Sequence, residues 1–369
     1  MRKKKICIVS AYAYIKEYIN YGSLFQYYAL EKTLIRMGFH PYWLRYRINS
    51  KVSLKGLIKK RIKIVFNIKG EREKRKILEK FSIFIKNNLE VSQREYYSEK
   101  ELKKNLPEAD YYITGSDQVW AGSDPVNYLC FVPDEKKRIS YAASFGKKTI
   151  PDYQLTLIKP WLKRFDSVTV REKSGVEICG KIGINARHTV DPTLLLNKDD
   201  YPYSTQYENK KYNLLYFLNI NDKKDFPFEI VDELKKSAEI KIVAGVSNID
   251  DFVENQYLEY FSPEDWLGAY KYASCIFTNS FHGTVFALIF HRPFWVFLQK
   301  GKSEGQNERI LSLLQMVNLE NRICDNDIGS LIHNKIDWEK VDDILKKERE
   351  KSIRYLKEAL GQEKINYEN

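Results

Sequence analysis

The chain has 369 residues, of which 30% are charged and 43% hydrophobic, and it carries a net charge of +12. This is the composition of an ordinary globular protein, and the length suits two domains of about 150 to 200 residues better than one core. No run reaches the roughly 18 uninterrupted apolar residues of a spanning helix, which argues against an integral membrane protein.

The first apolar run, residues 6–15, follows four basic residues in a layout that mimics a secretory signal peptide. Lys16 and Glu17 follow the run at once, and its small residues lie inside the run rather than beyond it, unlike a cleavage site. We therefore expect residues 6–14 to form a buried strand of a cytoplasmic protein.

Strands and helices alternate through the first 200 residues. The apolar patterns predict a strand at 6–14, a helix at 22–38, a strand at 42–48, a helix at 72–88, strands at 110–113 and 138–143, a helix at 152–164, and strands at 167–171 and 188–191. Such alternation is typical of a parallel sheet with helices on both faces. We assign residues 1–200 to a first domain and Asn197–Lys211 to a linker.

A basic segment interrupts the first domain. Residues 51–80 contain 12 Lys and Arg against 3 Glu, which accounts for most of the surplus positive charge. Apolar residues from Leu54 to Ile68 recur there at helical spacing, which fits a basic amphipathic helix on an anionic membrane surface. A solvated helical flap over a domain edge fits as well. Nucleic acid is disfavoured because no binding motif accompanies the charge. We treat about 51–90 as a basic helical insertion.

A second alternation occupies residues 210–335. The pattern predicts a strand at 212–218, a helix at 225–238, a strand at 240–244, a helix at 263–272, a strand ending at 277 and a strand at 294–298. The remaining residues, 336–369, include a charged helix at 337–360 with one apolar stripe. The five cysteines are scattered without the tight spacing of a zinc site, which predicts free thiols and no metal site.

Three strands run directly into polar turns. The first junction carries Asp117, the second carries Arg171, and the third carries His282 immediately before Gly283. Such junctions gather along one edge of an open α/β sheet, where ligands bind. A helix that starts at such a turn also favours an anion. We therefore expect an acid, an arginine and a histidine to share one crevice.

These junctions belong to a series of motifs in a characteristic order. They are Asn20-Tyr21-Gly22 with Gln26 and Ala29-Leu30, Gly115 to Trp120, Ser140 to Gly146, Val170-Arg171-Glu172, Val190 to Leu195, and Ser280 to Thr284. In this order they resemble the polysaccharide pyruvyl transferase family over most of residues 6–324. The resemblance implies two Rossmann-like domains in a GT-B-like arrangement, with the acceptor side in the first domain and the donor side in the second, across a cleft.

The resemblance also implies an activity. The family transfers the enolpyruvyl group of phosphoenolpyruvate to a saccharide as a cyclic ketal with release of phosphate, in surface or capsular polysaccharide biosynthesis. Phosphoenolpyruvate is then the donor substrate, and no cofactor is expected. The acceptor would be a saccharide, free or lipid-linked, and the basic insertion would rest on the inner face of the cytoplasmic membrane.

Residue roles follow from this chemistry. We expect His282 and Asp117 to act in catalysis, His282 as acid and base and Asp117 by receiving or orienting a hydroxyl. The donor-binding candidates are Arg171, Asn279, Ser280, Gly283 and Arg309. The acceptor-binding candidates are Asn20, Tyr21, Gly22, Ser116, Trp120 and Tyr141, the two last as stacking surfaces for a sugar.

Other interpretations remain open for single residues and for the whole chain. Arg171 could form a salt bridge with Glu172, Asp117 could cap a helix, and Asp191-Pro192 is interpreted mainly as structure. Many relatives carry arginine where this chain has Ser280, which leaves the second cation of the donor site to Arg309 or a nearby lysine. The alternatives for function are a GT-B nucleotide-sugar glycosyltransferase and a non-catalytic basic protein that binds membrane or nucleic acid.

Overall fold

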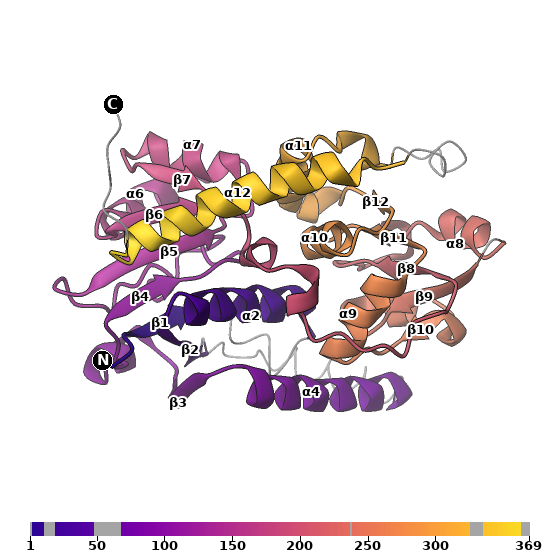
Figure 1. The fold of residues 1–369 in the computed structure, drawn as a ribbon, viewed down its shortest axis with the longest axis horizontal. Coiled ribbons are helices and arrows are strands. Elements are labelled where there is room, and N and C mark those ends of the chain that lie inside the picture. The colour runs from indigo at the N-terminus through magenta and orange to yellow at the C-terminus, as the bar shows by residue number, and fades with distance from the viewer. Residues whose placement is uncertain (1, 11–18, 48–67, 237, 325–334, 363–369) are drawn as a thin grey trace.

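The computed structural model describes residues 2–10, 19–47, 68–236, 238–324 and 335–362. Two parallel sheets lie side by side along the long axis of the molecule, each covered by helices (Figure 1). Their central strands are almost wholly buried, as expected for parallel strands with helices on both faces, whereas most of the edge strands are partly exposed.

The first sheet has seven strands in the order β3-β2-β1-β4-β5-β6-β7. They are β1 (Lys5–Val9), β2 (His40–Tyr46), β3 (Val91–Tyr96), β4 (Tyr111–Thr114), β5 (Lys137–Ala143), β6 (Ser167–Val170) and β7 (Ala186–His188). Its helices are α2 (Tyr21–Arg36), α5 (Glu99–Lys104), α6 (Asp152–Leu162) and α7 (Lys173–Lys181). All strand pairs are parallel, so the carboxyl ends of β4 and β6 lie at the same edge.

The second sheet has five parallel strands in the order β10-β9-β8-β11-β12. They are β8 (Tyr212–Tyr216), β9 (Glu239–Val243), β10 (Leu258–Glu259), β11 (Cys275–Thr278) and β12 (Phe294–Val296). Its helices are α8 (Phe228–Leu234), α9 (Pro263–Tyr272), α10 (Phe281–Ile289) and α11 (Asn307–Met316).

Two long helices lie on opposite sides of the molecule. The helix α12 (Trp338–Ala359) extends over both sheets, and α4 (Ile68–Asn88) lies along α2 and α9 (Figure 1). On α4, Phe81 packs 5.2 Å from Tyr21, and Lys74 Nζ lies 3.2 Å from Asp250 Oδ2 beyond β9. The polar contacts of α12 likewise reach both sheets, through Glu358 to Arg187 at 2.7 Å and Asp342 to His291 at 2.9 Å. The sheets are therefore joined by a shared hydrophobic core and by two bridging helices.

The described part of the basic insertion is the helix α4. Its apolar residues Ile77, Phe81, Phe84 and Ile85 are buried against the rest of the protein, whereas Ile83 is exposed. The two interpretations of the insertion depend on the apolar residues from Leu54 to Ile68, and residues 48–67 lie outside the described residues.

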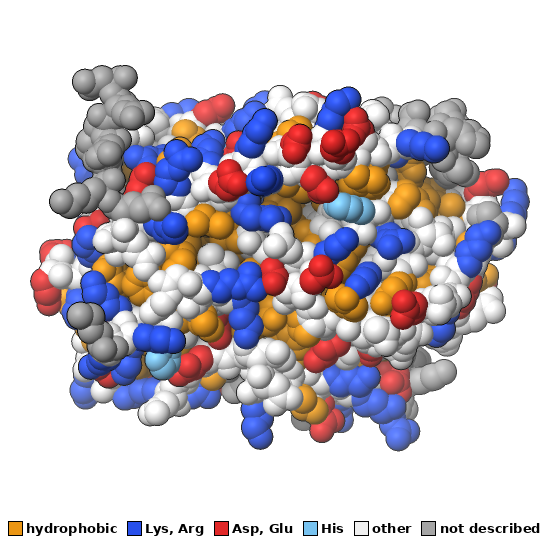
Figure 2. Space-filling model, in the orientation of Figure 1, with side chains coloured by type: hydrophobic (Ala, Val, Ile, Leu, Met, Phe, Trp, Pro, Cys, Tyr) orange, Lys and Arg blue, Asp and Glu red, His pale blue; other side chains and the backbone are white. Residues whose placement is uncertain are grey.

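The surplus positive charge does not form one continuous patch on the face shown in Figure 2. There, Lys and Arg side chains are interspersed with Asp and Glu side chains. Within the described ranges, no helix is both long enough and apolar enough to span a bilayer.

Candidate active site

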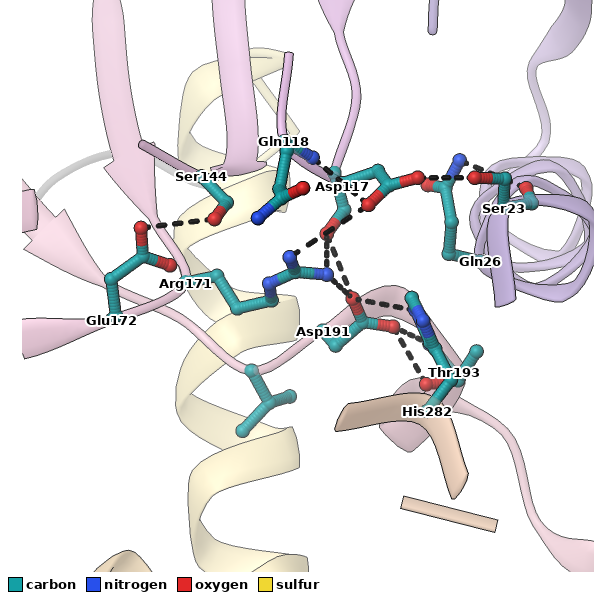
Figure 3. A network of polar contacts seen from close by, with 12 residues as sticks. Ser23, Gln26, Asp117, Gln118, Ser144, Arg171, Glu172, Asp191, Thr193 and His282 are labelled. Atoms are coloured by element: carbon teal, nitrogen blue, oxygen red, sulfur yellow. Dashed lines mark hydrogen bonds and ion pairs between the residues drawn. The ribbon is translucent and has the colours of Figure 1, made fainter. Parts of the chain in front are cut away.

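The three predicted junctions meet where the two sheets adjoin. Asp117 follows β4, Arg171 follows β6, and His282 lies in the first turn of α10, after β11 (Figure 3). A fourth junction joins them, because Asp191 follows β7. The carboxyl-end edges of both sheets thus contribute to one polar cluster, as is typical of ligand sites in open α/β folds.

Asp191 is the centre of this cluster. Its Oδ2 lies 2.6 Å from Arg171 Nη1 and accepts a 2.8 Å hydrogen bond from Ser116 Oγ. Its Oδ1 accepts bonds from the hydroxyl and the backbone N–H of Thr193, at 2.6 and 3.0 Å. Burial alone would raise the pKa of Asp191, but His282 and Arg171 hold that pKa well below its ordinary value. The side chain is therefore a carboxylate at neutral pH.

His282 approaches the same carboxylate from the second sheet. Its Nε2 lies 3.6 Å from Asp191 Oδ2 and has no hydrogen-bond partner among the described residues. On its other side the ring abuts Gly22 in the first turn of α2, where an added Cβ would stand 2.1 Å from His282 Nδ1. The imidazole is thus held between the beginnings of α2 and α10, one from each sheet.

Asp117 completes the acidic side of the cluster. It has a positive φ of 77°, which is uncommon for a residue other than glycine and occurs where surrounding contacts enforce it. Its carboxylate accepts hydrogen bonds from the Gln118 N–H at 2.9 Å and from the Ser23 hydroxyl, and it lies 4.0 Å from Arg171 Nη2. Burial acts to raise the pKa of Asp117, but Arg171 and His282 outweigh it and lower that pKa.

A second arginine accompanies Arg171. The guanidinium carbons of Arg171 and Arg309 lie 4.4 and 5.9 Å from the centre of the Phe281 ring, and both side chains are buried. Burial and the neighbouring charge of Arg171 lower the pKa of Arg309 to about 10, which still leaves it charged at neutral pH. The two cations line a cavity of about 10 Å³ together with Phe281 and Asp191.

Helix N-termini add to this positive potential. Helices α2, α7 and α10 all begin at the cluster, with Asn20, Glu172 and Ser280 as their N-cap residues. The positive ends of their dipoles and two guanidinium groups favour an anionic ligand.

Three donor-binding candidates form hydrogen bonds or packing contacts within the protein. The Asn279 side chain forms two bonds with the backbone of Leu218, at 2.7 and 2.9 Å, and Ser280 Oγ accepts a 3.3 Å bond from the Gly283 N–H. A Cβ on Gly283 would stand 2.4 Å from Thr278 Oγ1, so this glycine allows close packing. In this arrangement the Asn279 side chain and the Gly283 N–H are engaged within the protein, and their role in donor binding stays a prediction.

The two residues expected to stack on a sugar, Trp120 and Tyr141, lie in the core in this arrangement. Trp120 is fully buried and stacks on Tyr128 at 5.5 Å, and the Tyr141 hydroxyl donates to the Val190 carbonyl from within the core. Tyr21 is buried against Trp266 at 4.9 Å.

The other acceptor candidates lie at the cluster and contact its residues. Asn20 caps α2 by accepting from Ser23 N–H at 3.0 Å, Gly22 contacts His282, and Ser116 donates to Asp191. Through these contacts, Asn20 and Gly22 at the beginning of α2 and Ser116 after β4 adjoin the polar cluster.

Sequence reasoning missed the central residue. Asp191 was interpreted as a structural exit from its strand, although it follows a strand in the same way as Asp117 and Arg171 do. Applying the same junction rule to β7 would have found it.

Glu172 was considered only as a partner for Arg171, but its Oε1 accepts bonds from Ser144 and from the Phe145 and Gly146 N–H groups. Burial raises the pKa of Glu172. In the part of the chain that is described, no group of His, Cys, Asp and Glu has the geometry to hold a metal ion.

Comparisons with known proteins agree with this arrangement. The sequence model of the family described as polysaccharide pyruvyl transferase matches residues 20–301. No curated protein matches the sequence. Among solved structures, MnaA of S. aureus in complex with UDP is similar with a TM-score of 0.55 at 12% identity, covering 98% of each chain. Anabaena Alr3699/HepE in complex with UDP and glucose has a TM-score of 0.50 at 8% identity, covering 98% of this chain and 100% of that one. These likenesses confirm the predicted fold class, two Rossmann-like domains in a GT-B-like arrangement.

Proposed function

The chain belongs to the polysaccharide pyruvyl transferase family, and we propose that it transfers the enolpyruvyl group of phosphoenolpyruvate to a saccharide as a cyclic ketal, releasing phosphate. The proposed acceptor is an intermediate of surface polysaccharide assembly, free or lipid-linked. We propose that the reaction takes place in the cytoplasm, where phosphoenolpyruvate is made.

One observation carries this proposal. Arg171 Nε and Nη2 and Arg309 Nε are buried nitrogen atoms that donate no hydrogen bond to any described residue. Buried guanidinium groups without full hydrogen bonding are costly, and a bound anion would supply the missing acceptors. Phosphoenolpyruvate carries a carboxylate and a phosphate, which are the two groups that guanidinium forks bind best.

The chemistry requires a proton donor beside these cations. A proton delivered to the terminal carbon of phosphoenolpyruvate makes the adjacent carbon electrophilic, and a sugar hydroxyl then adds to it. The carbon–oxygen bond to phosphate breaks, and a second hydroxyl attacks the same carbon and closes the ketal. Of the two protons that the hydroxyls lose, one replaces the proton given to carbon and the other leaves with phosphate.

We assign the proton transfer to His282. Its Nε2 is free of hydrogen bonds to the described residues and lies 3.6 Å from the carboxylate of Asp191, at the centre of the cluster. General acid–base catalysis of this kind contributes about 10²- to 10⁴-fold in rate. We assign to Asp117, which is ionised and lies 4.0 Å from Arg171 Nη2, the hydrogen bond from an acceptor hydroxyl.

The test is direct. The purified protein is mixed with phosphoenolpyruvate and a panel of saccharides, and phosphate release is measured together with the mass of the saccharide. Phosphate release with a gain of one pyruvate less one water supports the proposal. Release of a nucleoside diphosphate from a nucleotide sugar would instead assign a glycosyltransferase. A His282→Ala variant that folds but retains full turnover would contradict the role of the imidazole.

A further inference from the structure

A group of side-chain amides lies at the carboxyl ends of the three strands β8, β11 and β12. This amide cluster consists of Asn219, Asn221, Asn279, Gln299, Gln306 and Asn307. The edge where they gather is the usual ligand-binding edge of an open α/β sheet. None of the expected acceptor residues lies in this sheet, and the stacking residues among them are buried.

The inner members of the amide cluster form a rigid base. Asn279 is bonded to both backbone groups of Leu218, and Asn307 is bonded to both backbone groups of Gln299, at 2.9 and 2.8 Å. The Gln299 side chain in turn donates to the Asn279 carbonyl at 3.0 Å. These bonds fix the loops after the three strands relative to one another.

The outer members are held by this base and face accessible space. Asn219 is exposed, and its Nδ2 donates to Gln299 Oε1 at 2.8 Å and to Gln306 Oε1 at 3.5 Å. Asn221, also exposed, donates to the Asn219 carbonyl at 3.0 Å. Within the described residues, the side-chain oxygens of Asn219 and Asn221 and the NH₂ group of Gln306 take part in no hydrogen bond. Neutral donors and acceptors therefore remain available on a preorganised surface.

The amide cluster is also continuous with the donor site. Gln306 Oε1 accepts a 3.1 Å hydrogen bond from Arg309 Nη2, so a ligand on the outer amides would lie one side chain away from the buried cations. An amide offers a donor and an acceptor in one plane, which matches neighbouring hydroxyl groups on a sugar ring. An anion would gain more from the arginines than from these neutral groups.

We propose that the amide cluster is a saccharide subsite, and that Asn219, Asn221 and Gln306 bind hydroxyl groups of the acceptor. Its role as acceptor site rests on the proposed function, but the binding of a neutral saccharide does not. The acceptor then lies against the second sheet, in contrast to the first domain that the sequence suggested.

The test uses Asn219→Gly, which removes the side chain and keeps the positive φ of 59° accessible. Asn209→Gly is the matched control, because Asn209 is also exposed, has a φ of 65°, and lies in the segment between the two sheets. The probes are methyl glycosides of common hexoses and N-acetylhexosamines, observed by saturation-transfer NMR with the full chain in the presence of inorganic phosphate. Titration with inorganic phosphate alone reports on the arginine site.

We expect Asn219→Gly to weaken glycoside binding about ten-fold, the effect of one or two lost hydrogen bonds, while phosphate binding stays unchanged. Asn209→Gly should behave as the unaltered protein. Equal glycoside binding in both variants, or no binding of any glycoside by the unaltered protein, would overturn the proposal. Glycoside binding that depends on Asn219, combined with no ketal formation, would leave the subsite standing and refute the proposed reaction instead.

Discussion

Gly22 and His282 touch across the boundary between the two sheets. An added Cβ at position 22 would lie 2.1 Å from His282 Nδ1, far inside contact distance, so only glycine lets the imidazole reach its place beside Asp191. The two residues lie in the first turns of α2 and α10. The position of the proposed proton donor therefore depends on a residue of the other sheet.

Gly22→Ala should displace the imidazole and lower turnover about 100-fold, because misplacing a catalytic group by about 1 Å costs that much. The control is Gly180→Ala on α7, where no atom lies within 4 Å of the added Cβ and helix propensity gains up to about 1 kcal/mol. Steady-state rates and thermal unfolding curves of both variants separate a loss of turnover from a loss of stability. Full activity of a folded Gly22→Ala variant would contradict the assignment of His282.

Asp191→Asn should lower both stability and turnover. The substitution leaves the buried Arg171 cation without its carboxylate partner, a loss of about 3 to 5 kcal/mol. Thr193→Val is the milder variant, because it removes only the 2.6 Å bond from the Thr193 hydroxyl to Asp191. We expect Thr193→Val to stay folded and to lower kcat more than it raises KM for phosphoenolpyruvate. If Thr193→Val changes the unfolding temperature but leaves kcat intact, the role of Asp191 is structural.

Arg309→Lys should raise KM for phosphoenolpyruvate about 10- to 100-fold, since a lysine cannot reproduce the guanidinium fork and one or two charged hydrogen bonds are lost. Arg138→Lys is the matched control, because Arg138 is also buried but donates to Val132 and Asp134, away from the cluster. That control should lose stability and keep KM. If both variants keep the KM of the unaltered protein, Arg309 is not the second cation of the donor site.

The stability of the folded protein should depend on pH through Glu31. Its buried carboxyl group accepts the Glu90 N–H, and burial raises its pKa to about 8, against about 4.3 in an unfolded chain. Between these values the folded state holds a proton that the unfolded state has lost, so stability falls as pH rises from about 5 to 8. Glu31→Gln should flatten this slope in urea unfolding, whereas Glu79→Gln, at an exposed site on α4, should not. Identical slopes in all three proteins would refute the prediction.

Tyr141→Phe tests the corrected position of a residue expected to stack on a sugar. Loss of its buried hydrogen bond to Val190 should cost about 1 kcal/mol of stability and leave KM for the saccharide unchanged. A rise in that KM without a change in the unfolding temperature would restore the original expectation.

Local patterns predicted those parts of the fold that local chemistry decides. The helix expected at 263–272 is α9 (Pro263–Tyr272), because Ser262 caps it and Pro263 opens it. The junction rule brought Asp117 and Arg171 together because their parallel strands end at one edge of the first sheet, and His282 joins them because the corresponding edge of the second sheet adjoins it.

What the sequence could not predict depends on packing between distant segments. Trp120 and Tyr141 have the chemistry of sugar-stacking residues, and only the packing around them shows that they are core. The contact of Gly22 with His282 and the bonds that occupy Asn279 arise between different elements, so no local pattern indicates them. The strand β3 (Val91–Tyr96) has a mixed burial pattern at the sheet edge, which explains why its apolar signal is weak.

The size of the cavity between Arg171 and Arg309 has a consequence for the proposed donor. Its 10 Å³ would hold about one water molecule, which is much less than the volume of a three-carbon phosphate ester. If the donor binds between the two guanidinium groups, we expect the side chains around Phe281 or the two sheets to move before each turnover.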